Sequence, residues 1–361
     1  MMPIKVVYVN SYQGSGIGDF GKHIYDELHA NKSVQIRYLE SGENWTDLFR
    51  IWRSILFTKE TAILNMGFTS FGKSPFKNFM NFLLIFIKQR ILHKNILIIL
   101  HDSPDIVNEN ISGYRFFSLM KWGGNIATKL MSSSHIIVFS EELKSILIKK
   151  YGIKKVNYYP MPCISEFKSL FNSERDDIKI VNVGYIAPYK GLDILPDIKK
   201  ELEKSGMKNI EFNVIGKPHK LLYKTKKGRE EIDTLILKLK KSGVNVMGYV
   251  PTREVETMLK KGKNIAILPY KLEYGSSSSA IFFIERGIPV IAINHKEFIK
   301  FKELGAGVVT FNTFQDIPKI LKSFTEGKNN LMELSKQNRE YCEKYNVNNF
   351  INVLLKISIN S

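Results

Sequence analysis

The chain has 361 residues, of which 44% are hydrophobic, and this excludes both a disordered chain and a small single-domain scaffold. Its 53 Lys and Arg outnumber its 35 Asp and Glu, so the formal net charge of +18 predicts an anionic partner: a nucleic acid, a lipid headgroup or a phosphorylated metabolite. The two cysteines, Cys163 and Cys342, exclude a disulfide framework, argue against a zinc site and favour a reducing compartment.

The amino-terminal residues predict a buried strand rather than a secretion signal, because the apolar run at 6–9 is short and lacks a small-residue cleavage site. No stretch reaches the ~18 uninterrupted apolar residues of a spanning helix, and the nearest, 79–87, is about half as long. We therefore expect a cytoplasmic protein, either free or peripheral on the cytoplasmic face of a membrane.

Short apolar runs bounded by turn residues predict buried strands along the chain. They lie at 5–9, 62–65, 96–100, 135–139, 178–183, 211–215, 244–247, 265–268, 290–293 and 308–310. Segments with helical periodicity separate most of them, at 20–29, 141–151, 193–205, 231–242 and 254–261. This alternation predicts parallel sheets with helices on both faces, interrupted by a linker near 158–177. We therefore predict two doubly wound α/β domains, over 1–165 and 178–335, that face a central cleft.

Two loops of the first half follow predicted strands, where ligands of such sheets bind. The turn with Gly14, Gly16 and Gly18 opens a helix and can present backbone N–H groups to an anion, although its spacing fits a dinucleotide fingerprint only loosely. His101 directly follows the strand at 96–100. It is either a site residue or merely the last residue before a turn that begins at Asp102, and position alone leaves both interpretations open.

Three segments of the second half occur in a characteristic order. They are VNVGYIAPYKGLDIL at 181–195, VMGYVP at 246–251, and IAILPY at 265–270 continuing through GSSSS at 275–279 to GIPVIA at 287–292. In this order they resemble the nucleotide-sugar-binding domain of the retaining glycosyltransferases of family 4 (glycosyl transferases group 1). Those enzymes have the GT-B fold of two Rossmann-like domains. The resemblance covers most of the chain, including the turn at 14–18 and His101.

The resemblance implies Lys190 and His101 as the catalytic residues. Lys190 would neutralise charge on a departing diphosphate, and His101 would orient a sugar hydroxyl or help to stabilise a cation-like transition state. It implies that the loop formed by Gly275, Ser276, Ser277, Ser278 and Ser279 binds phosphate oxygens. A solvated lysine and a flexible serine-rich linker are the alternatives. Further donor contacts are expected at Gly16, Gly18, Gly184, Gly216, Lys217, Tyr249, Val250 and Glu273.

The chain departs from the family's pattern at the donor site. Tyr185 stands where the family commonly has an arginine, and the family's two glutamates fall on Tyr274 and Phe282. These departures put one phosphate contact and the ribose contact in doubt. Glu285, three residues beyond Phe282, is interpreted as a surface acid.

The resemblance implies transfer of a sugar, with retention, from a UDP- or GDP-linked donor to a glycan or polyprenyl-linked acceptor. The 178–335 domain would bind the nucleotide sugar and the 1–165 domain the acceptor, with a C-terminal helix at about 338–361 packing back on the first domain. Neither a metal nor a cofactor is implied. Two alternatives stay open: a nucleotide-sugar 2-epimerase that would recruit acids such as Asp19, Asp102 and Glu273, and a catalytically degraded binding or scaffold protein.

Two segments concentrate positive charge. Residues 71–95 combine five Lys and Arg with aromatic residues at helical spacing and carry no acid, which is typical of an anionic membrane surface helix but also of a helix that covers a sheet. Residues 217–229 follow a predicted strand and either line the cleft near a diphosphate or form a solvated loop. Without any RNA-binding, helix-turn-helix or zinc signature, we expect no nucleic-acid partner.

Overall fold

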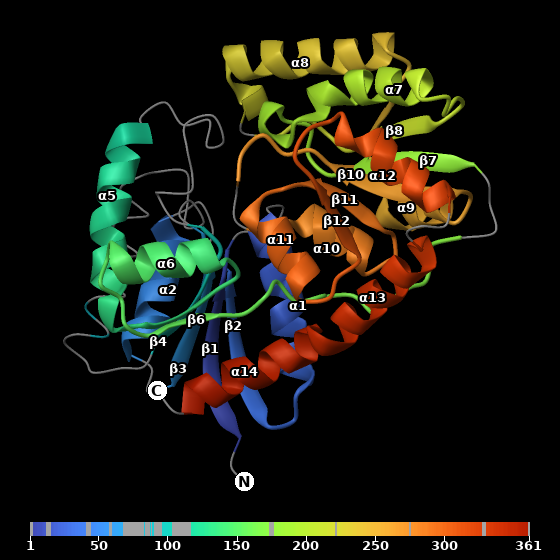
Figure 1. Ribbon diagram of the computed structural model, residues 1–361. Helices are drawn as coiled ribbons and strands as arrows, with labels where there is room; N and C mark the ends of the chain where they lie inside the picture. Colours follow the sequence, from blue (N-terminus) through green and yellow to red (C-terminus); the bar gives the residue numbers. More distant parts are fainter. Residues whose placement is uncertain are drawn as a thin grey trace. The chain divides into compact units, whose positions relative to one another are not determined.

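The computed structural model describes residues 3–11, 16–40, 45–57, 60–67, 83, 87, 89, 96–102, 117–172, 177–220, 222–273, 276–326 and 330–359. These residues form two compact units (Figure 1). The first unit holds the described residues up to Ile164 and those from Tyr345 onward, and the second unit is Ser165–Lys344.

The first unit is built on a six-stranded sheet in the order β2-β1-β3-β4-β5-β6, with every neighbouring pair parallel. Its strands are β1 (Ile4–Asn10), β2 (Val34–Glu40), β3 (Thr61–Met66), β4 (Ile96–Leu100), β5 (His135–Val138) and β6 (Val156–Tyr158). Its helices are α1 (Gly16–Ala30), α2 (Trp45–Phe57), α5 (Phe117–Leu130), α6 (Glu141–Lys149) and α14 (Val347–Ile359). Helices α2, α5 and α6 share one buried core with the sheet, and α1 packs against α14.

The second unit repeats this plan with the strand order β12-β11-β10-β7-β8-β9. Its strands are β7 (Ile178–Val183), β8 (Glu211–Ile215), β9 (Asn245–Gly248), β10 (Lys263–Leu268), β11 (Val290–Ile293) and β12 (Val308–Phe311). Its helices are α7 (Leu195–Lys204), α8 (Lys226–Lys241), α9 (Thr252–Leu259), α10 (Ser278–Ile284), α11 (Lys296–Glu303), α12 (Asp316–Thr325) and α13 (Leu331–Lys344). The prediction of two doubly wound α/β domains is confirmed.

The C-terminal region differs from the single helix expected at about 338–361. It consists of α13 in the second unit and α14 in the first, separated at Tyr345 and Asn346. The side chain of Asn346 accepts a hydrogen bond from the backbone N–H of Asn349 at 2.8 Å, which starts a new helix, and Cys163 N–H donates to Tyr345 C=O at 2.9 Å. Of the residues expected to pack on the first domain, 338–344 therefore lie in the second unit.

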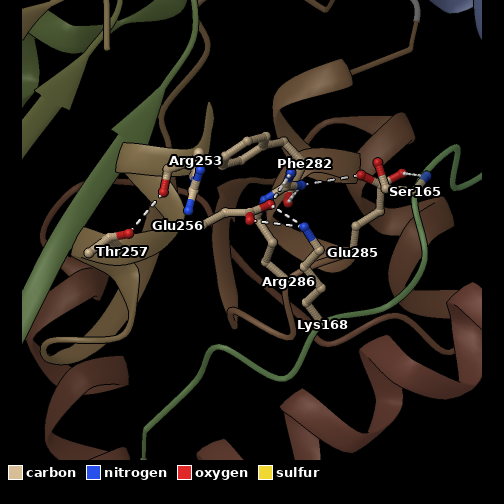
Figure 2. A network of polar contacts seen from close by, with 8 residues as sticks. All are labelled: Ser165, Lys168, Arg253, Glu256, Thr257, Phe282, Glu285 and Arg286. Atoms are coloured by element: carbon tan, nitrogen blue, oxygen red, sulfur yellow. Dashed lines mark hydrogen bonds and ion pairs between the residues drawn. The ribbon is translucent and has the colours of Figure 1, made fainter. Parts of the chain in front are cut away.

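The segment that follows Ile164 is pinned to the second unit rather than loose (Figure 2). The N–H of Ser165 donates to Glu285 Oε1 at 2.9 Å, and the N–H of Lys168 donates to the Glu285 carbonyl at 2.8 Å. Leu170 N–H donates to the carbonyl of Arg286 at 3.0 Å, and the Leu170 side chain is buried. From Ser165 to Leu170, the predicted linker is thus an ordered segment that packs over the end of α10, and we call this segment the strap.

The interpretation of Glu285 as a surface acid is wrong, because the strap covers it. Its side chain is 3% exposed, and Arg286 Nη1 lies 3.3 Å from Glu285 Oε2. Arg286 Nη2 also binds Glu256 Oε1 at 2.9 Å, and Lys168 Nζ binds Glu256 Oε2 at 2.9 Å. Burial opposes ionisation of Glu256, but these two cations hold its pKa below the ordinary value.

Within the part of the chain that the structure describes, no helix combines the length and the hydropathy needed to cross a membrane. The basic segment at 71–95 lies outside the described residues except for three helical positions, 83, 87 and 89. The proposed membrane surface helix is therefore left as a prediction from the sequence.

Candidate functional site

The strand order of the second sheet locates the site. In a doubly wound sheet, ligands bind beyond the carboxyl ends of the strands, where the strand order reverses. The chain passes from β7 outward to β8 and β9 and then returns to β10 on the other side of β7, so the reversal lies between β7 and β10. The loops that follow these two strands carry Lys190, Tyr270 and Ser277.

These three side chains form a connected cluster. Lys190 Nζ donates to Tyr270 Oη at 2.7 Å and lies 3.9 Å from the centre of the Tyr270 ring. Tyr270 Oη lies 3.0 Å from Ser277 Oγ, and both of these side chains are buried. Among the residues that the structure describes, no carboxylate lies within ion-pair distance of Lys190.

A glycine lets the Lys190 turn press against the end of β10. Residues Pro188–Lys190 form a 3-10 turn that Gly191 ends with a φ of 68°, a left-handed conformation that favours glycine. A Cβ at Gly191 would lie 1.8 Å from the carbonyl oxygen of Pro269. Lys271 N–H donates to Tyr189 C=O at 2.9 Å and joins the two loops. The backbone, not only the side chain, therefore fixes Lys190 beside Tyr270.

Of the described residues of the serine loop, Ser277 belongs to this cluster and the others lie beside it. Ser277 is the N-cap of α10, where its Oγ accepts from Ala280 N–H at 3.2 Å. Ser279 Oγ lies 2.7 Å from the place where a Cβ on Gly184 would stand, while Ser276 is half-buried and Ser278 is exposed. Gly275 lies outside the described residues.

Glycines also line the carboxyl ends of β7, β8 and β9. Gly184 N–H donates to Ile215 C=O at 3.0 Å, and Gly216 N–H donates to Gly248 C=O at 2.7 Å. A Cβ on Gly216 would lie 1.7 Å from the carbonyl oxygen of Gly184, so the backbones approach too closely for a side chain. The loops after β7 and β8 therefore pack directly against each other through their backbones.

Four other residues that were expected to contact the sugar donor lie outside the cluster of Lys190, Tyr270 and Ser277. Tyr249 follows β9 with 70% of its surface exposed, and Lys217 Nζ lies 5.3 Å from the centre of its ring. Val250 is half-buried. Glu273 Oε1 accepts from Lys296 N–H at 2.6 Å, which assigns this carboxylate to the start of α11. The basic stretch at 217–229 is only partly a loop, because α8 begins at Lys226.

The structure adds two residues to the neighbourhood of Lys190 that sequence reasoning missed. Glu297, in the first turn of α11, accepts a hydrogen bond from the N–H of Ser277. Burial raises the pKa of Glu297 well above its ordinary value, more than the Ser277 N–H and the charge of Lys190 lower it. Nothing in the sequence around Glu297 marks it apart from its position shortly after a predicted strand.

His219 is the second of these residues, and its ring packs edge-on against Tyr185 with the ring centres 5.4 Å apart. Burial and the charge of Lys190 lower the pKa of His219 to about 4. At neutral pH His219 is therefore uncharged, and burial opposes ionisation of Glu297. The ammonium of Lys190 gives this corner of the second unit a positive charge that suits an anion.

The first unit carries a polar network at its own reversal of strand order, between β1 and β3. His101 Nε2 lies 2.8 Å from Asn65 Oδ1. Asn65 Nδ2 donates to Asn10 Oδ1 at 2.8 Å and to the Ile17 carbonyl at 2.9 Å, and Asn10 Nδ2 donates to the Gly18 carbonyl at 2.8 Å. The network fixes the first turn of α1, which begins at Gly16.

This network also fixes the protonation of His101. Because the amide nitrogen of Asn65 is used as a donor, its Oδ1 is the acceptor, and His101 Nε2 carries the hydrogen. Burial lowers the pKa of His101 to about 3. The ring centres of Phe20 and Phe139 each lie 5.1 Å from the centre of the His101 ring. His101 is thus a neutral imidazole whose Nδ1 is left as an acceptor.

Acid is expected to destabilise the first unit through His101. The unfolded chain binds a proton on this histidine near pH 6.5, whereas the folded unit does so only near pH 3. The free energy of unfolding therefore falls as the pH drops below ~6.5, by up to about 2 kcal/mol at pH 5. Urea unfolding of the wild type and of His101→Asn between pH 5 and 7.5 gives the free energy of unfolding as a function of pH. The contribution of His101 is the difference between the slopes of the two curves, and parallel curves would contradict it.

Comparisons with known proteins found a family match in the second unit. Residues 165–341 match the family model described as glycosyl transferases group 1. No curated protein matches the chain. The family model thus covers Lys190, Tyr270, Ser277 and the glycine-lined edge of the second sheet.

Solved structures match over nearly the whole chain. HepE of Anabaena in complex with UDP-glucose is 12% identical, with a TM-score of 0.66, and the match covers 99% of each chain. Sucrose-phosphate synthase from Thermosynechococcus elongatus is 10% identical, with a TM-score of 0.66, and the match covers 99% of this chain and 98% of the synthase. The UDP-forming trehalose-phosphate synthase from Burkholderia xenovorans is 10% identical, with a TM-score of 0.63, and the match covers 99% of each chain. Residues 165–341 therefore resemble glycosyl transferases group 1, and the chain has the GT-B fold.

Proposed function

We propose that this protein transfers a sugar from a nucleoside diphosphate sugar to an acceptor hydroxyl, with retention at the anomeric carbon and without a metal. The observation that carries the proposal is the ammonium of Lys190, which is held at the reversal of strand order in a glycosyl transferases group 1 domain and has no carboxylate partner among the described residues. The complexes of HepE with UDP and with UDP-glucose support a nucleoside diphosphate as the ligand class.

The donor is proposed to bind along the carboxyl edge of the second sheet. Lys190 would hold the diphosphate, with N–H groups and hydroxyls of the loop from Gly275 to Ser279 as further donors. Gly184 and Gly216, which directly follow β7 and β8, would contribute backbone contacts to the donor. The exposed ring of Tyr249, which has Lys217 beside it, offers a surface for stacking a nucleobase. Glu273 is a weaker candidate for the donor sugar, because its carboxylate already binds the N–H of Lys296.

The catalytic step is proposed to be mainly electrostatic. As the bond from the sugar to the diphosphate breaks, negative charge grows on the leaving phosphate oxygens, and Lys190 stabilises it from a position that is already fixed. His101 in the first unit would accept a hydrogen bond from a sugar hydroxyl through Nδ1. Because its imidazole is neutral, it would orient that hydroxyl and carry no charge of its own. The acceptor is proposed to be a glycan or a polyprenyl-linked sugar.

Ligand binding and donor hydrolysis test the proposal together. We expect one of UDP, GDP and ADP to raise the melting temperature, since a ligand at ~100 times its Kd stabilises the folded state by ~2.7 kcal/mol. We also expect slow hydrolysis of the matching radiolabelled nucleotide sugar in the absence of acceptor. If none of the three diphosphates shifts the melting temperature and no nucleotide sugar is hydrolysed, the proposal fails.

A further inference from the structure

The hydroxyl of Tyr270 is shared by the two loops of the cluster. Tyr270 lies just beyond β10, is 5% exposed, and packs edge-on against Phe298 with the ring centres 5.4 Å apart. Its Oη contacts Lys190 Nζ from the loop after β7 and Ser277 Oγ from the loop before α10. A single buried oxygen therefore connects the cation to the serine loop.

The chemistry of Lys190 gives its contact with Tyr270 a direction. An ammonium can only donate, so Tyr270 Oη accepts from Lys190. Either hydroxyl can be the donor between Tyr270 Oη and Ser277 Oγ at 3.0 Å, and Ser277 Oγ also accepts from Ala280 N–H at 3.2 Å. Hydrogen bonds thus connect Lys190 to Ser277 through one phenol oxygen, and neighbouring bonds in such a chain polarise one another.

A tyrosine is suited to hold a lysine whose charge is needed elsewhere. A carboxylate would fix the ammonium equally well but would cancel its charge. The phenol oxygen and the ring face fix it and leave the charge in place, with Nζ 2.7 Å from the oxygen and 3.9 Å from the ring centre. The long side chain of lysine loses considerable freedom on ordering, so a lysine that is already held loses less when a ligand binds.

We propose that Tyr270 is a positioning residue of this site: it holds the ammonium of Lys190 in place for an anionic ligand. This inference rests on the proposed function, in which Lys190 binds the diphosphate. Tyr270 acts through Lys190 and is not required to touch the ligand itself.

The Tyr270→Phe variant tests the proposal, because it removes the oxygen and keeps the ring that packs on Phe298. We expect the rate of donor hydrolysis or transfer to fall about tenfold, as for loss of a hydrogen bond to a charged group, with a smaller change in the KM for the donor. We expect no further loss when Tyr270→Phe is added to Lys190→Ala. Tyr223→Phe is the matched control, because the Tyr223 hydroxyl binds Asp233 at 2.9 Å on the exposed surface of the same unit.

A second readout does not depend on activity. Competitive acetylation followed by mass spectrometry measures the reactivity of each lysine amine, and we expect Lys190 to become several-fold more reactive in Tyr270→Phe but not in Tyr223→Phe. The inference is overturned if the reactivity of Lys190 is unchanged, or if the effects of Tyr270→Phe and Lys190→Ala multiply in the double variant. If the wild type binds none of UDP, GDP and ADP and hydrolyses no nucleotide sugar, both the proposed function and this inference are refuted. If the wild type is active and Tyr270→Phe has the same activity as the wild type, only the inference about Tyr270 is refuted.

Discussion

Replacing Lys190 by alanine is expected to lower the turnover of donor hydrolysis and of sugar transfer about 100-fold. A hydrogen-bond donor fixed where charge develops in a transition state contributes ~2.7–4 kcal/mol to lowering the barrier. Lys190 Nζ donates a hydrogen bond to Tyr270 Oη at 2.7 Å and would be such a donor. The neighbouring His219 has a pKa of about 4, so it is uncharged at neutral pH and cannot replace the cation. Steady-state kinetics with a radiolabelled nucleotide sugar measures the effect.

Lys271 provides the matched control, because it lies in the same loop as Tyr270 and its ammonium is already neutralised by Asp193 Oδ2 at 2.7 Å. We expect Lys271→Ala to keep activity within about twofold of the wild type, as for removal of a surface ion pair. The melting temperature of both variants should stay close to that of the wild type. Near-normal turnover of Lys190→Ala would refute the role assigned to this lysine.

Replacing Arg286 by methionine is expected to lower the free energy of unfolding of the second unit by about 3–5 kcal/mol. Arg286 is 5% exposed and binds both Glu285 and Glu256, and its guanidinium lies 3.8 Å from the centre of the Phe282 ring (Figure 2). Methionine fills much of the space but removes a cation from beside the buried carboxylate of Glu285. Urea unfolding measures the loss.

Two further variants separate the ion pairs from packing. Lys168 binds the same Glu256 from a side chain that is half exposed, so Lys168→Met is expected to cost no more than about 1 kcal/mol. Adding Glu285→Gln to Arg286→Met should restore part of the stability, because the amide keeps an acceptor for the Ser165 N–H and removes the buried charge that Arg286 had balanced. A loss below about 1 kcal/mol in Arg286→Met would show that the buried pair contributes little.

The central strands could be predicted from the sequence because their environment is simple. A strand such as β4, with the sequence ILIIL, is buried on both faces of a parallel sheet and must be apolar throughout. The edge strand β2 was not predicted, because its residues alternate between more buried and more exposed positions and include Gln35 and Arg37. The three-residue strand β6 is too short to give a pattern.

The sequence by itself determined the two α/β domains and, through the order of its motifs, the likeness to glycosyltransferases; it also made Lys190 a candidate. These features follow from residues that are close together in the sequence and from the order of short motifs, so they can be recognised without the structure. Only the tertiary structure decided the rest. It placed Tyr270 between Lys190 and Ser277, Glu297 against the N–H of Ser277, and Glu285 beneath the strap that follows Ile164. The physical reason is that the charge state and the partners of a buried polar group depend on residues that folding brings to it from distant parts of the chain.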